Sequence, residues 1–591
     1  MRPFFDLGRL QKAPEAIMIP AWCALFLATD GFYSKWGICV GLAAAALHCA
    51  VIRGFRRSGY SLLLALWALW LCAGFLYGTN YYEILFAVLK ALLSLLFFCL
   101  ASRLAPRGSA CVRCTIIALG AVLSAVNLVK YFCAGGNTSA FWGIDYANAL
   151  ASVLLVSACT AACAMSGAVN VRRRILWGAC LGLCAAAIWI TKCRAVWALA
   201  LAALPLSALI GARNLRRRTR LYISLGLLTV YAAAALLLAP RVLPQLLNAT
   251  ELLERFASDH DALAVIGRAP WSGLGAGGWE SRQFSFQTAR YGMRYVHCSL
   301  LQAGADGGVP GMLLSGAAAL FPILYGLRRM RSEKAVRLPT LCCAMLFLHS
   351  LFDFVFSIPG VWMIYLLLAA QILPEGRPLT AGAEKRAAAA CGLLLPAALC
   401  LFVSELFFSA GLRAYAAQSY QTAETRLETA EALDRASAEI PYTLSFVSVS
   451  RIQNGTAPQY VSQAADELKR AEALDRGNYK YADAQAMLFS LSGDPKSAAE
   501  MFKKEISLHP LAEQGYNGLA ASLSALLRTG ENPSDREYAE DSVSWALNAL
   551  DAARSGCSPL AWRLKHTPAF DESRLALEAV CASREENGEA E

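Results

Sequence analysis

A series of apolar segments, joined by short connections that carry arginine, most constrains this fold. A membrane-spanning helix needs roughly 20 mainly apolar residues. Only 16% of the residues are charged, whereas soluble domains have about 25%. We therefore predict an all-α polytopic membrane helix bundle over residues 1–410, with about 12 to 13 spans. The expected spans are 16–34, 36–52, 60–77, 82–101, 111–130, 146–167, 174–191, 194–211, 221–239, 298–326, 338–356, 358–373 and 387–410.

The arginines of the connections predict how the bundle is oriented. They occur in alternate connections, as in Arg53-Gly-Phe-Arg56-Arg57, the run 172–174 and the run 216–218. Connections of this kind face the cytoplasm. We expect the N-terminus inside, the loop 240–297 outside and, with thirteen spans, residues 411–591 outside as well. One miscounted span would reverse the side of the C-terminal part. Because topology accounts for the net charge of +11, we expect no nucleic-acid partner.

The cysteines and the first apolar segment suggest no processing or metal site. Most of the 20 cysteines lie within apolar spans, where cysteine acts as a small hydrophobic residue. Cys111 and Cys114 form a C-x-x-C pair without a second pair, which is weak as a zinc site. The first apolar segment lacks a clear cleavage site, so we expect it to remain as a helix.

Residues 411–580 have the composition of a soluble helical domain. The sequence AEALDR occurs at 430–435 and again at 471–476, and Leu474 and Leu508 are 34 residues apart. A 34-residue period is typical of tetratricopeptide repeats. We expect a tetratricopeptide-like helical domain, with a generic helical bundle as the alternative, and a disordered acidic tail at 581–591.

Three sets of polar residues lie on the expected outer face: Arg194 between two spans, the arginines of the loop 240–297, and His349 with Asp353 one helical turn apart. Polar groups at membrane depth are costly and suggest function. Simpler interpretations remain open. Arg194 could extend to the lipid headgroups, and His349 could pair with Asp353 within one helix. The loop residues Arg282, Arg290 and Arg294 could be solvated or contact headgroups.

The loop itself contains Gly273-Leu-Gly275-Ala-Gly277-Gly278 and ends on His297. This run matches a dinucleotide fingerprint but lacks its strand and helix context, so we interpret it as a turn that permits close approach. We expect Trp271, Trp279 and Phe284 near the membrane interface. His297 opens an apolar helix in which Pro310 predicts a kink.

These residue types suit one kind of chemistry. Arginine binds phosphate oxygens in a bidentate manner, and histidine can accept a proton from an attacking hydroxyl. Together they suit displacement of a diphosphate by an alcohol. Because the exterior loops show no paired acidic cluster for Mg²⁺, we expect neither a metal nor another cofactor.

The order of these motifs resembles the O-antigen ligase family of bacterial membrane proteins. His297-Cys298, followed by Gly308-Val-Pro-Gly311, resembles the family's histidine motif. Arg255 with Pro270-Trp-Ser-Gly273-Leu-Gly275 resembles its loop motif, and Thr191-Lys-Cys-Arg194 its arginine motif. The segment FWGIDYANA at 141–149 is also similar. Cys193 and Cys298 depart from the family pattern at the positions next to Arg194 and His297.

The resemblance implies an inverting, metal-independent glycosyltransferase of the bacterial cytoplasmic membrane. Its donor would be a glycan on undecaprenyl diphosphate, and its acceptor a glycan, lipid or protein. His297, Arg255 and Arg194 would be catalytic, with both arginines binding the diphosphate. Arg290, Arg294, Asp353, His349 and Trp279 complete the expected substrate-binding set.

Other functions remain possible from the sequence. A polymerase of lipid-linked repeat units would use the same residues with another acceptor. A lipid-linked saccharide transporter predicts related halves with broken helices, and no such symmetry is visible. The chain could also anchor its C-terminal domain, which suits a protein partner.

Overall fold

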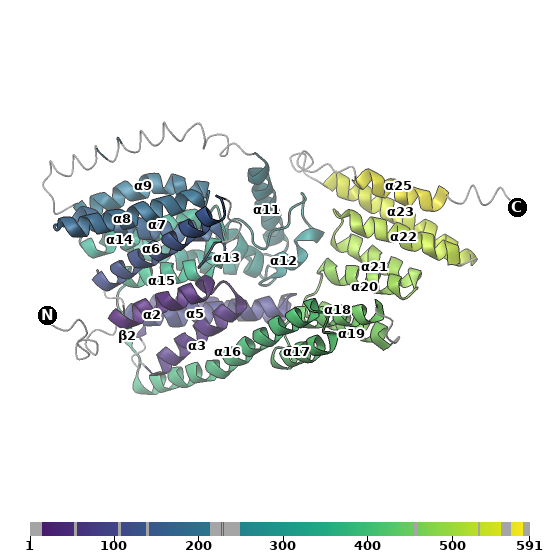
Figure 1. Ribbon diagram of the computed structural model, residues 1–591, viewed down its shortest axis with the longest axis horizontal. Coiled ribbons are helices and arrows are strands. Elements are labelled where there is room, and N and C mark those ends of the chain that lie inside the picture. Colours follow the sequence, from purple (N-terminus) through teal and green to yellow (C-terminus); the bar gives the residue numbers. More distant parts are fainter. Residues whose placement is uncertain are drawn as a thin grey trace.

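The computed structural model describes residues 15–51, 56–104, 108–136, 141–212, 249–453, 459–529, 532–556 and 569–582, together with Gly226 and Thr229. Within these residues the protein is almost wholly helical, and a bundle of long apolar helices adjoins a second layer of shorter helices (Figure 1). The expected all-α polytopic bundle is confirmed: in the described part of the chain, eight helices are long and apolar enough to cross a membrane.

The bundle helices follow the apolar segments of the sequence closely. They are α2 (Glu15–Ala28), α3 (Lys35–Val51), α4 (Gly59–Tyr77), α5 (Tyr81–Leu104), α6 (Ala110–Cys133), α7 (Ala147–Gly167), α8 (Val171–Ile190), α9 (Arg194–Gly211), α13 (Ser299–Arg329), α14 (Arg337–Ser350), α15 (Pro359–Ile372) and α16 (Ala381–Ala416). Short 3-10 turns η1 (Asp30–Phe32), η4 (Lys334–Val336) and η5 (Val355–Ser357) lie between them. Each expected span has a helix except 221–239, where the structure describes only Gly226 and Thr229.

The segments that connect the bundle helices lie alternately at two opposite ends of the bundle, which we call the arginine end and the loop end. The arginine end contains 56–58, 108–109, 168–170, 330–336 and 373–380. Here β1 (Arg56–Arg57) pairs antiparallel with β2 (Arg377–Pro378), which shows that two of the arginine-bearing connections adjoin. The loop end contains 78–80, 134–136 with 141–146, 191–193, 269–298 and 351–358. The alternation of charge in the sequence thus matches the two ends of the bundle.

The chain between α9 and α13 is more helical than the sequence suggests. The sequence predicts a loop at 240–297, whereas its described part begins with the 20-residue helix α11 (Ala249–Arg268). A short helix α12 (Gly278–Arg282) and the turn η3 (Gln283–Ser285) come after it. The apolar residues of α11 recur at helical spacing, and its buried side chains Ala262, Val265 and Ile266 face the rest of the protein. Such spacing is the usual signal of an amphipathic helix.

The glycine-rich turn packs into a break in α13. The helix is interrupted at Gly307 and Gly308, just before Pro310, where the sequence predicts the kink. The backbone N–H of Leu274 donates to the carbonyl of Ala305 (2.8 Å), and that of Val309 donates to Pro270 (2.7 Å). These bonds satisfy backbone groups that the broken helix leaves open. The two glycine motifs of the sequence are therefore structural partners.

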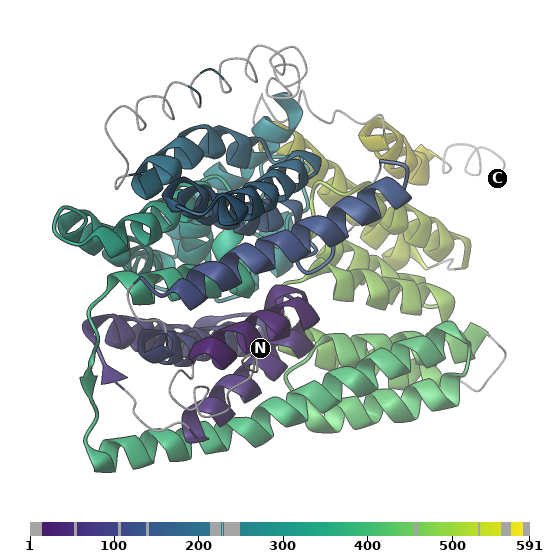
Figure 2. The same cartoon turned by 60° about the vertical axis from the view of Figure 1, so that its left-hand side comes forward.

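One long helix links the bundle to the C-terminal domain. Helix α16 extends 36 residues and continues through the predicted domain boundary at residue 410. Its first part packs on α3 and its last part on α17 (Tyr420–Leu433). In Figure 2 it runs as one rod, in teal and green, from the bundle to the C-terminal helices.

The C-terminal helices form a layer at the loop end. They are α17, α18 (Glu439–Gln453), α19 (Gln459–Leu474), α20 (Tyr479–Leu491), α21 (Pro495–Leu508), α22 (Glu513–Thr529), α23 (Pro533–Gly556) and α25 (Ala569–Ala582). We call these helices the tail. Successive helices pack as antiparallel pairs, which agrees with helix–turn–helix units. The sequence predicts a disordered acidic tail at 581–591, but Cys581 and Ala582 are the last residues of α25; the rest, 583–591, lies outside the described residues.

The tail is docked on the bundle through several contacts. The Arg476 N–H donates to the carbonyl of Thr79 (2.9 Å), and its guanidinium donates to the hydroxyl of Tyr81 (3.1 Å). Arg290 of the loop forms an ion pair with Glu513. The tail therefore lies on the same side of the bundle as the loop, whichever compartment that side faces.

Candidate functional site

Arg255 and Asp353 form the centre of a polar cluster at the loop end. Arg255 lies in α11, and its Nη1 donates to the carbonyl of Phe352 at 2.9 Å. The same Nη1 lies 3.8 Å from Oδ2 of Asp353, whose side chain is 1% exposed, while that of Arg255 is 33% exposed. A buried carboxylate thus orients a guanidinium that remains accessible.

The segment FWGIDYANA supplies the other partners of Asp353. The Tyr146 hydroxyl lies 2.8 Å from each carboxylate oxygen, and Asn148 Nδ2 donates to Oδ2 at 2.6 Å. Helix α7 begins directly after Tyr146, so the two side chains project from the first turn toward the α14–α15 connection. These donors compensate for the cost of burying the carboxylate. The sequence pointed to this segment without giving either residue a role.

His349 and Asp353 do not form the pair that their spacing suggests. Helix α14 ends at Ser350, so Asp353 lies beyond it in the connection to α15. His349 is buried, and its Nδ1 lies 2.6 Å from Oγ of Ser152 in α7. Its Nε2 lies 3.7 Å from the Cys193 sulfur. The interpretation that His349 pairs with Asp353 within one helix is therefore wrong, because α14 ends at Ser350, before Asp353.

Cys193 and Arg194 come from the connection between α8 and α9. Lys192 has a positive φ of 57°, and this turn brings Cys193 toward His349. Arg194 is half-buried at the first position of α9, on the loop end of the bundle. The cysteine that departs from the family pattern thus contacts a histidine, and the adjacent arginine lies at the same end as Arg255.

His297 lies beside this cluster without hydrogen bonding to any described residue. Its Nδ1 is buried and has no partner among them. Its ring meets that of Phe354 edge-on, with 5.3 Å between centroids, and Phe354 stacks on Tyr146 at 4.6 Å. Burial, and then the positive charge of Arg255, lower the pKa of His297 to about 4. The imidazole is therefore neutral at pH 7 and able to accept a proton.

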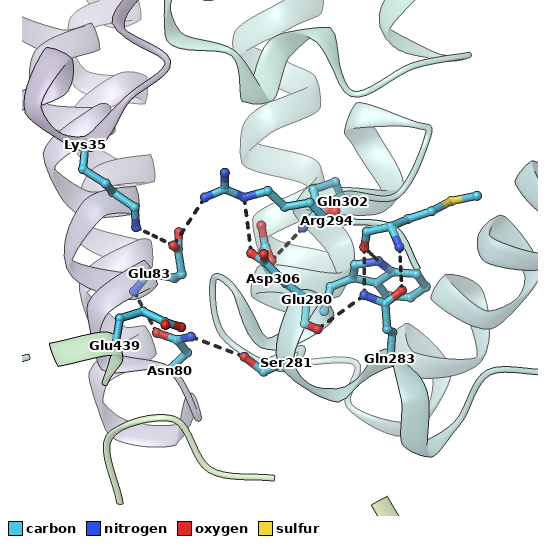
Figure 3. Close-up of polar contacts among 12 residues, drawn as sticks. Lys35, Asn80, Glu83, Glu280, Ser281, Gln283, Arg294, Gln302, Asp306 and Glu439 are labelled. Atoms are coloured by element: carbon cyan, nitrogen blue, oxygen red, sulfur yellow. Dashed lines mark hydrogen bonds and ion pairs between the residues drawn. The ribbon is translucent and has the colours of Figure 1, made fainter. Parts of the chain in front are cut away.

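Arg290 and Arg294, the expected binding residues of the loop, are held by carboxylates. Arg290 is paired with Glu513 of the tail. Arg294 lies 3.5 Å from Glu83 of α5 and 3.3 Å from Glu280, as Figure 3 shows. Both arginines thus have structural partners, and neither contacts Asp353 in the ion pairs described.

The aromatic residues of the loop differ in their surroundings. Trp279 is fully buried, donates from Nε1 to the carbonyl of Met293 (3.1 Å) and stacks on Tyr291. The expectation that it lies at the membrane interface is therefore wrong, because it forms the core of the loop. Phe284 packs on Tyr479 and His509 of the tail. Trp271 is 76% exposed.

A second polar group, which the sequence reasoning missed, lies deeper in the bundle. Lys90 and Asp306 occupy apolar helices α5 and α13 and line one cavity together with Glu83 and Arg294. Charged residues within apolar spans could have signalled this cavity, because such residues usually mark functional paths. The sequence-based candidates all lay near the ends of the spans.

The polar cluster can bind an anion and accept a proton. Arg255 presents a fixed positive charge at an accessible position, and His297 presents a neutral imidazole nearby. Asp353 orients the arginine, and Tyr146 and Asn148 hold Asp353 in place. Such an arrangement suits stabilisation of a leaving group that develops negative charge, together with deprotonation of an attacking hydroxyl.

Comparison with known proteins finds a family match that covers part of this cluster. Residues 179–316 match the model of the O-antigen ligase family. The match includes Arg194, Arg255, His297 and Gly308, whereas Tyr146, His349 and Asp353 lie outside it. No curated protein matches the chain. Residues 179–316 are an O-antigen ligase domain, and the family resemblance of the sequence is confirmed.

Proposed function

We propose that the O-antigen ligase domain at residues 179–316 transfers a glycan from undecaprenyl diphosphate to an acceptor hydroxyl, at the outer face of the bacterial cytoplasmic membrane. The family supports glycan transfer in general, of the ligase or polymerase kind. The observation that carries the proposal is the accessible Arg255 held over buried Asp353, beside the neutral His297.

Arg255 is suited to hold the diphosphate. The bond from Nη1 to the Phe352 carbonyl and the nearby Asp353 charge fix the guanidinium plane. The rest of the fork remains available for phosphate oxygens, which match its geometry. Arg194, at the same end of the bundle, is the proposed second phosphate-binding residue. As the glycosidic bond to the diphosphate breaks, these arginines balance the charge that develops on the leaving oxygen.

His297 is the proposed base on the acceptor side. As a neutral imidazole, His297 can accept a hydroxyl proton while that oxygen forms the new bond to the anomeric carbon. Attack from the face opposite the diphosphate inverts the anomeric centre. No step of this proposal needs a metal ion, because the arginines supply the positive charge.

The test is transfer in vitro by the full-length protein in detergent or liposomes. The donor is a defined undecaprenyl-diphosphate glycan, and products are identified by mass spectrometry. We expect His297→Ala and Arg255→Ala to abolish transfer, whereas Arg268→Ala, an exposed arginine at the end of the same helix α11, leaves it unchanged. Unchanged transfer by well-folded His297→Ala or Arg255→Ala protein would overturn the proposal.

The same assay separates ligase from polymerase. Repeat units joined on the lipid would indicate a polymerase, whereas glycan on another lipid, wall polymer or protein would indicate a ligase. We propose the ligase reaction because the matching family is described as O-antigen ligase. A tetratricopeptide-like tail docked beside the site, on the proposed exterior side, would suit recognition of a protein partner or acceptor.

A further inference from the structure

A cavity of about 120 Å³ lies between α4, α5, α13, α15 and the loop, next to the Arg255 cluster. A buried water needs roughly 10–15 Å³ of such volume, so there is room for a single sugar ring but not for a whole repeat unit. Tyr295 and Ser299 line the cavity. On their other side, Tyr295 packs on Phe354 (5.0 Å), and Ser299 donates to the carbonyl of Asp353 (3.0 Å).

The charges of the cavity form a balanced set. Glu83 forms ion pairs with Lys35 and with Arg294 (Figure 3). Arg294 forms a second ion pair with Glu280. Counted in their usual charged forms, Lys35, Lys90 and Arg294 balance Glu83, Glu280 and Asp306. A charged ligand would upset this balance within a low-dielectric bundle. The set therefore favours an uncharged ligand with many hydrogen-bonding groups.

Lys90 and Asp306 are the two charged residues lining the cavity that form no ion pair with a described residue. The ammonium of Lys90 has no hydrogen bond or ion pair to any described residue, although it lies in the middle of α5. Asp306 accepts a bond from Gln302 Nε2 (2.9 Å), and Gln302 Oε1 accepts from the backbone N–H of Val296, next to His297 (2.7 Å). A donor and an acceptor thus face the same cavity, and Gln302 connects it to the catalytic segment.

Aromatic rings form the apolar part of the lining. Trp67 and Trp362 lie 5.9 Å apart in an edge-to-face arrangement, and Phe356 packs on Trp362 at 4.9 Å. Aromatic faces suit the C–H surface of a sugar, whereas each hydroxyl both donates and accepts a hydrogen bond. We propose that this cavity is a subsite for one uncharged sugar unit of the glycan, whose hydroxyls bridge Lys90 and Asp306.

This inference rests on the proposed glycan transfer but is tested without turnover. Saturation-transfer NMR on the full-length protein would use glucose, galactose, N-acetylglucosamine and glucuronic acid as probes. We expect at least one neutral sugar to bind, and Lys90→Met and Asp306→Asn to weaken that binding about tenfold, which corresponds to about 1.4 kcal/mol. Binding of glucuronic acid alone, or of no sugar, would overturn the inference.

Because charge removal could unfold the bundle, a second variant fills the cavity without changing a charge. Ser315→Leu extends a cavity-lining side chain of α13, and Leu313→Ala is its matched control on the lipid-facing side of that helix. We expect Ser315→Leu to abolish binding and Leu313→Ala to retain it. Equal binding by both variants would refute the site. Sugar binding by catalytically inactive His297→Ala would support the subsite even where transfer is absent.

The transfer assay distinguishes the two sources of the sugar. If the sugar belongs to the acceptor, Lys90→Met raises KM for the acceptor and leaves KM for the lipid-linked donor unchanged. If it belongs to the donor, the effects are reversed. Either result supports the subsite, whereas unchanged values for both substrates would contradict it.

Discussion

Arg255 Nη1 lies 3.8 Å from Asp353 Oδ2, and this ion pair joins helix α11 to the connection between α14 and α15. Asp353 is nearly inaccessible, so its charge acts on Arg255 rather than on a ligand. A buried carboxylate that orients an accessible guanidinium is a positioning residue. We therefore expect Asp353 to affect transfer through Arg255 alone.

Replacing Asp353 should separate orientation from stability. Asp353→Asn keeps a polar side chain but removes the charge opposite Arg255, so we expect transfer to fall roughly 10- to 100-fold with the fold retained. Asp353→Ala leaves Tyr146 and Asn148 without their acceptor, which costs about 1–3 kcal/mol per unpaired group. Transfer kinetics and thermal unfolding measure the two effects. Equal activity of wild type and Asp353→Asn would exclude the positioning role.

The pH dependence of transfer should reflect the low pKa of His297, about 4. A base with an ordinary histidine pKa would lose activity near about pH 6.5. We expect activity that depends on neutral His297 to persist to about pH 5 and to fall toward pH 4. Because the folded pKa is below the unfolded one, His297 stabilises the fold fully above about pH 6.5 and loses this contribution toward pH 4.

Arg255→Gln offers a control for that titration. Burial is the main cause of the lowered pKa of His297, and the charge of Arg255 is the second. Removing the charge should raise the pKa only in part, as NMR of the imidazole would show. A return to the ordinary value would mean that Arg255, rather than burial, dominates.

The Arg290–Glu513 ion pair should tie the loop to the tail. Both side chains are partly exposed, so we expect Arg290→Ala to cost only about 0.2–1 kcal/mol. The loss should appear as faster hydrogen exchange in residues 278–291 and in α22. Lys496→Ala, which breaks an exposed ion pair with Asp535 within the tail, is the matched control and should leave the loop unaffected.

Gly308 should not tolerate a side chain. Its φ is +64°, and a Cβ there would lie 2.5 Å from the carbonyl oxygen of Pro270. We expect Gly308→Ala to lower the unfolding temperature and to loosen the turn against α13, because left-handed backbone alone costs about 1–3 kcal/mol. Gly267→Ala, where nothing lies within 4 Å, should have little effect. Thermal unfolding of both variants would show the difference.

Glu505 in the tail should make stability depend on pH in the opposite sense to His297. Burial, and then the charge of Asp483, raise its pKa to about 8. Its contribution is present below the unfolded value near 4.5 and is lost as pH rises through 8. Glu505→Gln should abolish this loss and raise the unfolding temperature at about pH 9. The exposed Glu537→Gln in α23 should not.

Local sequence patterns predicted the helices well. Apolar length located the bundle helices within a few residues, because a membrane helix must satisfy its backbone internally. The two ends followed from the arginines. The end of α14 could not be predicted from the sequence. Leu351 and Phe352 continue the apolar pattern, although the helix ends at Ser350. Apolar composition marks burial in lipid or protein and does not mark the last hydrogen-bonded turn.

Pairings between distant segments were less predictable. The sequence identified Arg255, Asp353 and the segment around Asn148, but not that they meet, because such contacts depend on how the helices pack. The partners of Arg290 and Trp279 could not be predicted either. An arginine or tryptophan in a loop has the same local sequence pattern whether it contacts substrate, the tail or the core of the loop. Lys90 was the exception: its position within an apolar span was a signal that could have been used.

The length of helix α16 determines how the tail is rotated about the axis of that helix. The tail is fixed to the bundle by this continuous helix, by Arg476 on Thr79 and by Glu513 on Arg290. Each residue added to an α-helix rotates the chain beyond it by about 100° and moves it about 1.5 Å. One inserted residue would therefore turn both polar contacts away from their partners. The number of residues in α16 therefore fixes the orientation in which the tail contacts the loop.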